Sequence, residues 1–505
     1  MDFIFYVSVA SFIFLFGAID KCIDYDFWAR LVVGKSYFQT GALFHNDFQS
    51  YGTTGEFIDH EWGSSLIFYL IQNNFGDTGL YIFKSVVIFF TVFLITKIIR
   101  LEDKKIPLYF LFFFFTLQGI TYNIFSTIRC QTFSFFFFIF YLYILKKVQK
   151  EKSYKILYCI PLLNIVWANL HGGFSIGLVT VLIFAVGEYL NKSKWKPYFY
   201  TFIAASLTSL INPYGIKYIY FIFNALLLNR VHVLEWQSSF WGINKYMLLK
   251  YKLFFFPVIG IFLYSIFKNI NLKGIKEFYK NIDKTKYLLL IFMLIISVKS
   301  LRFHVFFTYS IIALCYCDFY KIFSIYKLPK TIDKAKEIVI CILLFISLVS
   351  HLKDYNFINT VKNGIYPVNC IEFLKINKIK GNLLVNFHLG SYASYKLYPN
   401  NLIYMDGRYE EVYDNKLINY MADIFRNIDY KKNLEKSNHE IIIIEKYYPL
   451  YTALKKDNDR FLAFEDQKFA LFLLNKYKNK QFKLPDKDDS YYNLTKFETD
   501  IDWLK

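Results

Sequence analysis

Long hydrophobic runs separated by short polar segments fill the first 352 residues of the chain. A helix that crosses a membrane needs about 20 mostly apolar residues, and about 17–25 are tolerated. The first run has no basic start and no small-residue cleavage site, so we expect a membrane anchor rather than a removable signal peptide. In all, the pattern predicts about eleven membrane-spanning helices, at residues 2–19, 79–99, 107–122, 131–146, 155–170, 173–190, 197–212, 249–267, 287–301, 303–320 and 336–352.

After residue 352 the pattern changes to hydrophobic segments of the length of a β-strand. Strands are predicted at 381–387, 401–408, 440–446 and 469–474, and helices between them at 368–377, 389–398, 414–426 and 447–456. Strands that alternate with helices are typical of a small α/β domain. We therefore expect a polytopic α-helical membrane domain over residues 1–352, which includes a first external loop at 20–78, and a C-terminal α/β domain over residues 353–505.

Lysine and arginine gather in every second connection between the predicted spans. The basic connections are at residues 97–105, 146–155, 191–196, 268–286 and 321–336. Because basic loops stay on the cytoplasmic side of a membrane, the N-terminus is predicted to be cytoplasmic. The connection at 20–78 and the C-terminal domain are then extracytoplasmic.

The composition agrees with a multi-pass membrane protein. Of the 505 residues, 55% are hydrophobic and 21% are aromatic, which is more than a soluble chain usually carries. The net charge of +19 would also suit nucleic acid or anionic lipid. Much of the lysine, however, lies in short loops where it sets topology, so we expect membrane lipids and no nucleic acid as partners. The seven cysteines have no zinc or disulfide spacing.

Two aspartates, Asp24 and Asp26, follow the first predicted span directly. The segment after them has helical apolar spacing and stops at Gly41, and a second amphipathic segment runs from Trp62 to Asn74. We expect both segments to be helices at the membrane interface. A carboxylate beside the N-terminus of the first helix is favoured by the helix dipole. The alternative is that both aspartates are solvated loop acids or that Asp26 caps the helix.

The first loop contains other titratable residues with less specific signals. Asp47 in HNDFQSYG is predicted to be a turn residue. His60 and Glu61 could form a metal pair, but no third ligand follows at a recognisable spacing. A structural or substrate-contacting role is therefore expected for both.

Three cations lie near the external ends of predicted spans: Arg129, Lys299 and Arg302. Charges at that depth are costly and point to function. Together they could hold the phosphate of a lipid-linked substrate, since arginine offers a bidentate fork and lysine a point charge. The alternative for each is that its long side chain extends to the lipid headgroups.

Further candidates lie in the short motifs WANLHGG, LEWQS and YMDGRYE. Asn169 and His171 suit either an interhelical hydrogen bond with a Gly-Gly turn or contact with a sugar or phosphate. Glu235 and Trp236 offer a carboxylate and an aromatic face, which suit the acceptor side of a sugar site. In the tail, Asp406 to Arg408 and the helix start at His388 and Gly390 lie at strand ends, where α/β domains place ligands; a structural Asp–Arg pair is the alternative.

The order of these motifs resembles that of the GT-C superfamily of membrane glycosyltransferases. The start of the chain, DYDFWARLVVGKSYFQTGALFHNDFQSY, then DHEWGSSLIFYLI, then FGDTGLYIFKSV, is similar to that of the aminoarabinose transferases and protein O-mannosyltransferases. The resemblance is closer to a largely uncharacterised bacterial group of GT-C-like proteins. It covers nearly the whole chain, with landmarks IRCQTFS, WANLHGGF, INPYG, LEWQS, SLRFH, HLGSYASYKLYP and YMDGRYE.

The resemblance implies a polyprenyl-phosphate-linked sugar as donor, entering from the bilayer, and a lipid, glycan or protein as acceptor. Transfer would occur on the external face of a bacterial inner (cytoplasmic) membrane, as a step of cell-envelope glycan biosynthesis. In this family a loop acid is the general base on the acceptor hydroxyl, and by position Asp26 or Asp24 matches it, with Asp26 favoured. The leaving phosphate needs cations to stabilise its charge.

Two departures from the family pattern limit the expectation about cofactors. The second external turn, TYNIFSTIRC, has no acid, and the tail has no WWDYG-like motif. Both omissions argue against a metal-dependent oligosaccharyltransferase. We expect no cofactor, and a divalent metal is left open. Two alternative functions also stay open: an inactive GT-C-like assembly subunit, and a polysaccharide polymerase or ligase that need not use an acid at the first span.

Overall fold

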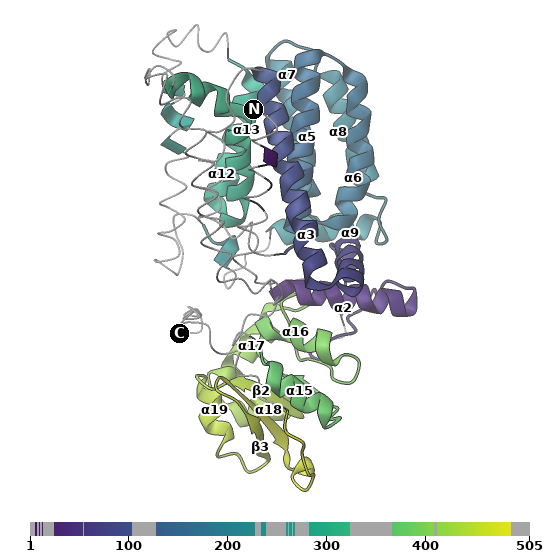
Figure 1. The fold of residues 1–505 in the computed structure, drawn as a ribbon, viewed down its shortest axis with the longest axis vertical. Coiled ribbons are helices and arrows are strands. Elements are labelled where there is room, and N and C mark those ends of the chain that lie inside the picture. Colours follow the sequence, from purple (N-terminus) through teal and green to yellow (C-terminus); the bar gives the residue numbers. More distant parts are fainter. Residues whose placement is uncertain are drawn as a thin grey trace. The chain divides into compact units, whose positions relative to one another are not determined.

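The computed structural model describes residues 6–7, 10, 13, 25–53, 55–103, 128–227, 234–238, 259–260, 262–264, 266–267, 282–323, 366–408 and 412–485. Asp24 and all or most of the predicted spans 2–19, 107–122, 249–267 and 336–352 lie outside these residues. The chain forms two compact units (Figure 1). The helical unit comprises Met1–Asp20 and Thr78–Phe357, and the mixed unit comprises Lys21–Asp77 and Ile358–Lys505.

Apolar helices packed side by side build the helical unit (Figure 1). The central helix α7 packs against α5, α8 and α12, while α6 packs on α8 and α12 on α13. The bounds are α5 Gln131–Glu151, α6 Cys159–Leu170, α7 Phe174–Leu190, α8 Lys196–Thr208, α9 Ile216–Leu227, α12 Lys284–Lys299 and α13 His304–Phe323, with short 3₁₀ turns η2 Tyr154–Tyr158, η3 Leu234–Trp236 and η4 Leu301–Phe303. The C-terminal part of α3, Trp62–Glu102, also belongs to this unit.

The predicted spans coincide with helices wherever the structure describes them, at 79–99, 131–146, 155–170, 173–190, 197–212, 287–301 and 303–320. Two of the described helices, α3 and α5, are long and apolar enough to cross a membrane. Tyr154–Leu170, α7 and α9 are apolar but shorter. The described part of the chain is thus mostly helical with two candidate membrane spans, and it does not support the predicted number of eleven. Helix α9 was not predicted, because its residues were assigned to an external connection.

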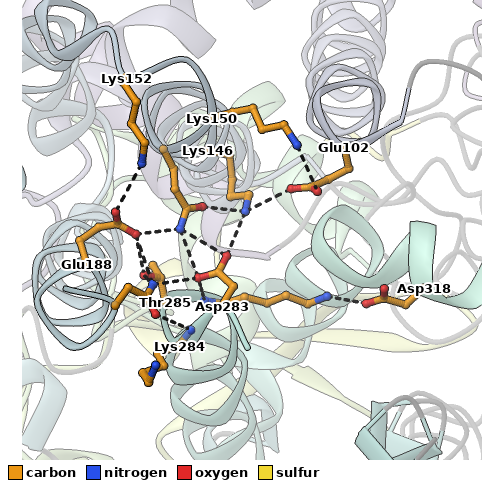
Figure 2. A network of polar contacts seen from close by, with 12 residues as sticks. Glu102, Lys146, Lys150, Lys152, Glu188, Asp283, Lys284, Thr285 and Asp318 are labelled. Carbon is orange, nitrogen blue, oxygen red and sulfur yellow. Dashed lines mark hydrogen bonds and ion pairs between the residues drawn. The ribbon is translucent and has the colours of Figure 1, made fainter. Parts of the chain in front are cut away.

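A network of charged and polar side chains joins the helices at one end of the helical unit (Figure 2). Gln149 Nε2 donates to Glu188 Oε1 at 2.8 Å and to Asp283 Oδ1 at 3.2 Å, and Lys146 Nζ donates to Gln149 Oε1 at 2.7 Å. Lys146 also pairs with Glu102 at 3.4 Å. Because Glu188 is only 2% exposed, its charge needs these partners. The ends of α3, α5 and α7 and the start of α12 therefore meet at one end of the unit.

The mixed unit is built on a four-stranded sheet. Its strands are β1 Leu383–Leu384, β2 Ile441–Glu445, β3 Arg460–Glu465 and β4 Phe469–Leu474, in the order β1-β2-β4-β3. Strand β1 is parallel to β2, and the other pairs are antiparallel. Every residue of β2 is buried, as expected for a strand that is covered on both faces. The C-terminal helices are α15 Val368–Ile376, α16 Phe387–Leu397, α17 Asn415–Phe425, α18 Tyr430–Lys436 and α19 Pro449–Leu454.

Most of the elements predicted for the C-terminal part are present. The exception among the strands is 401–408, where only Ile403 forms isolated bridges, to Ser50 and Leu383. The predicted strand was wrong beyond this pairing. Residues 402–404 form backbone hydrogen bonds with Gln49, Tyr51 and Leu383, and the chain then turns at Asp406 to Arg408, where Asp406 Oδ1 accepts from the Arg408 N–H at 3.2 Å. Strand β3 and helix α18 were not predicted. Strand β3 forms a hairpin with β4, and Asp466 Oδ1 accepts from the backbone N–H groups of Lys468 and Phe469 at the turn.

The first loop belongs to the same compact unit as the C-terminal domain, whereas the sequence grouped it with the membrane helices. Its first helix, α2 Tyr25–Thr40, ends at Gly41 with φ 72°, as predicted, and packs on α16. Trp28 carries much of this contact, with ring centroids 5.0 Å from Tyr392 and 5.7 Å from Tyr366. The second predicted loop helix is the start of α3, which breaks at Gly76 (φ 60°). The first loop joins the C-terminal domain because their aromatic rings pack together, and the sequence pattern does not show which rings contact each other.

Buried histidines make the stability of the mixed unit depend on pH. Burial, followed by the positive charge of Arg460, lowers the pKa of His439 to about 3. The unfolded residue takes up a proton near pH 6.5, so its stabilising contribution is present above that pH and is lost as the pH falls toward 3. Between pH 7.0 and 5.5 we expect the free energy of unfolding to fall by about 1 kcal/mol more in the wild type than in His439→Gln, which has no imidazole to protonate.

Hydrogen exchange of β2 in the full-length protein, corrected for intrinsic rates, measures this difference. The same change at the exposed His45 serves as control. An equal loss of protection in wild type and His439→Gln would contradict the assignment.

Candidate functional site

Asp26 lies in the first turn of α2 and is half-buried. Its carboxylate lies directly against the backbone of Gly407, because a Cβ atom added there would collide with Asp26 Oδ1. The sequence placed Asp26 beside the start of a helix, and the structure agrees. The structure also shows that the carboxylate contacts Met405–Arg408 of the C-terminal domain, here called the MDGR segment, within the same unit. Asp24, the other candidate base, lies outside the described residues.

Arg408 holds this MDGR segment in place from inside the mixed unit. Its Nε donates to Asp406 Oδ1 at 2.9 Å, its Nη1 to Asp47 Oδ1 at 2.7 Å and its Nη2 to the Tyr413 hydroxyl at 3.1 Å. Burial works against the guanidinium charge, but Asp406, Tyr413 and Asp47 outweigh it and hold the pKa of Arg408 well above its ordinary value. The predicted alternative of a structural Asp–Arg pair is therefore what the structure contains. Asp47 also accepts from the Gln49 N–H, as a turn residue does.

The acids of DHEW form a second buried cluster, around Arg30. Arg30 pairs with Asp59 and, at 3.5 Å, with Glu61 Oε2, and His60 Nε2 lies 3.6 Å from Glu61 Oε1. Asp59 also accepts from the Glu61 backbone N–H at 2.9 Å. These contacts fix the loop ahead of α3, which is the structural role left open for His60 and Glu61. Among the described residues no three His, Cys, Asp or Glu side chains are grouped to hold a metal ion.

In the helical unit, Glu235 lies between two of the three predicted cations. Its Oε2 accepts from Arg129 Nη1 at 2.8 Å and its Oε1 from Arg302 Nη1 at 3.1 Å. The Arg302 guanidinium lies 4.9 Å from the centre of the Trp236 ring. Among the described contacts these two guanidinium groups share one carboxylate, and both arginine side chains are about one-fifth exposed. Lys299, at the end of α12, is exposed, and no described hydrogen bond or ion pair joins it to this cluster.

His171 and Asn169 are held by hydrogen bonds between helices. His171 Nδ1 accepts from the Gly173 N–H at 3.0 Å and lies 2.6 Å from Ser134 Oγ, which itself accepts from Trp167 Nε1. Nδ1 therefore carries no proton, and Nε2–H is the donor of this imidazole. Asn169 donates to two backbone carbonyls, of Ile165 and Ile211. The interhelical bond and Gly-Gly turn named as one alternative are present, and a substrate contact stays a prediction.

The candidate residues that the structure describes thus divide between the two units. The mixed unit holds Asp26, His60, Glu61, His388, Gly390 and Asp406 to Arg408, and the helical unit holds Arg129, Asn169, His171, Glu235, Trp236, Lys299 and Arg302. Sequence reasoning missed the contact of Asp26 with Gly407 and the role of Arg30. A signal for Arg30 was present, since it is a charged residue inside the apolar helix FWARLVVG.

Neither protein-family models nor curated protein sequences yield a match to this chain. The class of the protein must therefore be inferred from the motifs, the fold and the two groups of residues.

The charge balance at Glu235 leads to a prediction. Replacing Glu235 by Gln removes the anion that both arginines share, so an added anion has more to gain there. We expect pyrophosphate to raise the melting temperature of Glu235→Gln in detergent by several degrees more than that of the wild type. Glu372→Gln, on the exposed surface of α15, is the control. Equal shifts in all three proteins would show that these arginines do not receive an anion.

Proposed function

We propose that the protein is a GT-C-type membrane glycosyltransferase. It moves a sugar from a polyprenyl-phosphate-linked donor to a lipid, glycan or protein acceptor on the external face of the bacterial inner membrane. The proposal rests on the motif order of the sequence, on the two-arginine cluster at Glu235 and on the position of Asp26. In the proposed membrane topology the protein has about eleven spans, a cytoplasmic N-terminus and an extracytoplasmic C-terminal domain.

The outer faces of the shorter helices support a membrane position beyond the two long ones. Large apolar side chains are exposed on η2, α6 and α8, among them Tyr158 (78%), Leu162 (65%) and Leu207 (61%). Large apolar side chains that are exposed on several neighbouring helices are unfavourable in water, whereas lipid tails solvate them. The joined polar ends of α3, α5, α7 and α12 also belong to connections predicted to be cytoplasmic. Their meeting at one end of the unit is what the predicted alternation requires.

The observation that carries the proposal is the Arg129–Glu235–Arg302 cluster. Both arginines lie at connections predicted to be external, and each presents a fork of N–H donors that matches phosphate geometry. A phosphate that replaces Glu235 as their partner would keep both guanidinium groups paired. In the proposed reaction these donors stabilise the negative charge that grows on the phosphate as the sugar leaves.

Asp26 supplies the base in the proposed reaction. The acceptor hydroxyl attacks the anomeric carbon, its oxygen forms the new glycosidic bond, and its proton passes to the Asp26 carboxylate. The bond from the anomeric carbon to the phosphate oxygen breaks, and polyprenyl phosphate leaves with the electron pair. General base catalysis contributes typically 10²–10⁴-fold to a rate.

Transfer from radiolabelled polyprenyl-phosphate-linked hexoses tests the proposal, with release of free polyprenyl phosphate as a readout that needs no known acceptor. We expect Asp26→Asn to lower the rate by about 100-fold or more. Arg302→Ala should raise the donor KM, and Arg302→Lys should restore only part of it, since it keeps the charge and loses the fork. The control is Asp77→Asn, because Asp77 lies with Asp26 in the Lys21–Asp77 part of the mixed unit and accepts a hydrogen bond from Gln72; we expect it to leave the rate unchanged.

Full activity in an Asp24→Asn/Asp26→Asn double variant would refute the loop-acid mechanism. Absence of transfer from every donor in the wild type would favour an assembly subunit without activity.

A further inference from the structure

We infer that Gly407 is a positioning residue for Asp26, and that the C-terminal domain thereby sets the geometry of the catalytic base. The inference rests on the proposed role of Asp26. It assigns to the MDGR segment a function in catalysis rather than in ligand recognition. Three features of the mixed unit carry it: the space at Gly407, the anchoring of the MDGR segment and the anchoring of α2.

The space at Gly407 is reserved for the Asp26 carboxylate. A Cβ atom added to Gly407 would collide with Asp26 Oδ1 and lie 3.6 Å from Asp26 Cγ. The next heavy atom is Ser391 Oγ, at 3.9 Å, which is an ordinary contact distance. A methyl group at residue 407 would therefore displace the Asp26 carboxylate and little else.

Other close glycines in this unit differ in what they meet. A Cβ atom at Gly390 would collide with the Met405 carbonyl and lie 3.0 Å from Asp406 Cα, and one at Gly52 would collide with the Tyr404 carbonyl. Those two glycines allow backbone segments to pack, which is a requirement of the fold. Gly407 alone among the three meets the proposed catalytic side chain.

The MDGR segment is rigid enough to act as a stop for the carboxylate. Arg408 fixes it through Asp406 on its own segment and Asp47 on the first loop, at 2.9 and 2.7 Å. The Arg408 guanidinium also lies 5.2 Å from the centre of the Phe57 ring. A displacement of this segment would weaken the pairing of a buried guanidinium, which costs free energy.

Helix α2 is anchored to the same domain next to Asp26. Tyr25 packs edge-on against the His388 ring at 5.1 Å, and Trp28 packs against Tyr392 at 5.0 Å. Asp26 lies between these two aromatic anchors in sequence.

Helix α2 is thus fixed to α16, and Gly390 of the same helix packs against the Met405 carbonyl of the MDGR segment. The base and the surface against which it rests are therefore held by one helix, so a small displacement of either changes their contact. Misplacement of a catalytic group by about 1 Å can cost about 100-fold in rate.

A double-variant cycle in the full-length protein tests the inference. We expect Gly407→Ala to lower kcat by about 10-fold or more and to leave the donor KM unchanged, because it moves the base and not the phosphate site. It should lower the melting temperature by about 2 °C or more. In an Asp26→Ala background the added methyl group has room, so Gly407→Ala should change the melting temperature by about 1 °C or less and leave the residual rate unchanged.

The two readouts separate the inference from the proposed function. The control is Gly55→Ala in the first loop, which also contains Asp26. A Cβ atom there would lie 3.3 Å from the terminal Oγ1 of Thr53, so we expect neither the melting temperature nor the rate to change. Equal losses of melting temperature or rate from Gly407→Ala in both backgrounds would overturn the inference, even if the enzyme transfers sugar. If no transfer is found, the melting-temperature cycle still decides whether Gly407 positions Asp26, and only the proposed function fails.

Discussion

The mixed unit depends on one buried charge, the guanidinium of Arg408. A charge inside a protein is tolerated only when it is paired and hydrogen-bonded, and removing one partner of such a group typically costs about 3–5 kcal/mol. Arg408 takes its carboxylates from two distant parts of the chain, Asp47 in the first loop and Asp406 beside it. The first loop and the C-terminal domain must therefore fold together. The immediate surroundings of Asp26 follow from that requirement.

The helical unit applies the same constraint at its ends. Its helices are apolar along their lengths, and its polar networks gather where they end, around Glu188 and Asp283 at one end and around Glu235 in the η3 segment. In the first network acidic side chains and lysines from the helix ends pair with one another, so we assign it a structural role (Figure 2). The second has two guanidinium groups for one carboxylate and stays partly exposed. These two forks of N–H donors, which match phosphate geometry, are why the proposal places the donor phosphate there.

Local patterns in the sequence predicted much of the fold. Hydrophobic runs located the described helices from α5 to α8 and α12 to α13, and Gly41 marked the end of α2. What failed depends on distant contacts. Residues 401–408 look like a strand, yet Arg408 pairs with a residue 361 positions away. Likewise Trp28 gives no sign in the sequence that its partners are Tyr366 and Tyr392. The candidate residues could be named from charge in apolar surroundings, but not their partners.

The lipid that copurifies with the protein shows directly whether it binds a polyprenyl phosphate. The protein would be extracted from its native membrane in mild detergent and examined intact by native mass spectrometry, followed by fragmentation of any bound lipid. If the protein is the proposed glycosyltransferase, we expect one polyprenyl phosphate, free or sugar-linked, per chain in the wild type and its loss in Arg129→Ala/Arg302→Ala. A wild-type protein that retains only ordinary phospholipids, or a double variant that retains polyprenyl phosphate unchanged, would contradict the proposal.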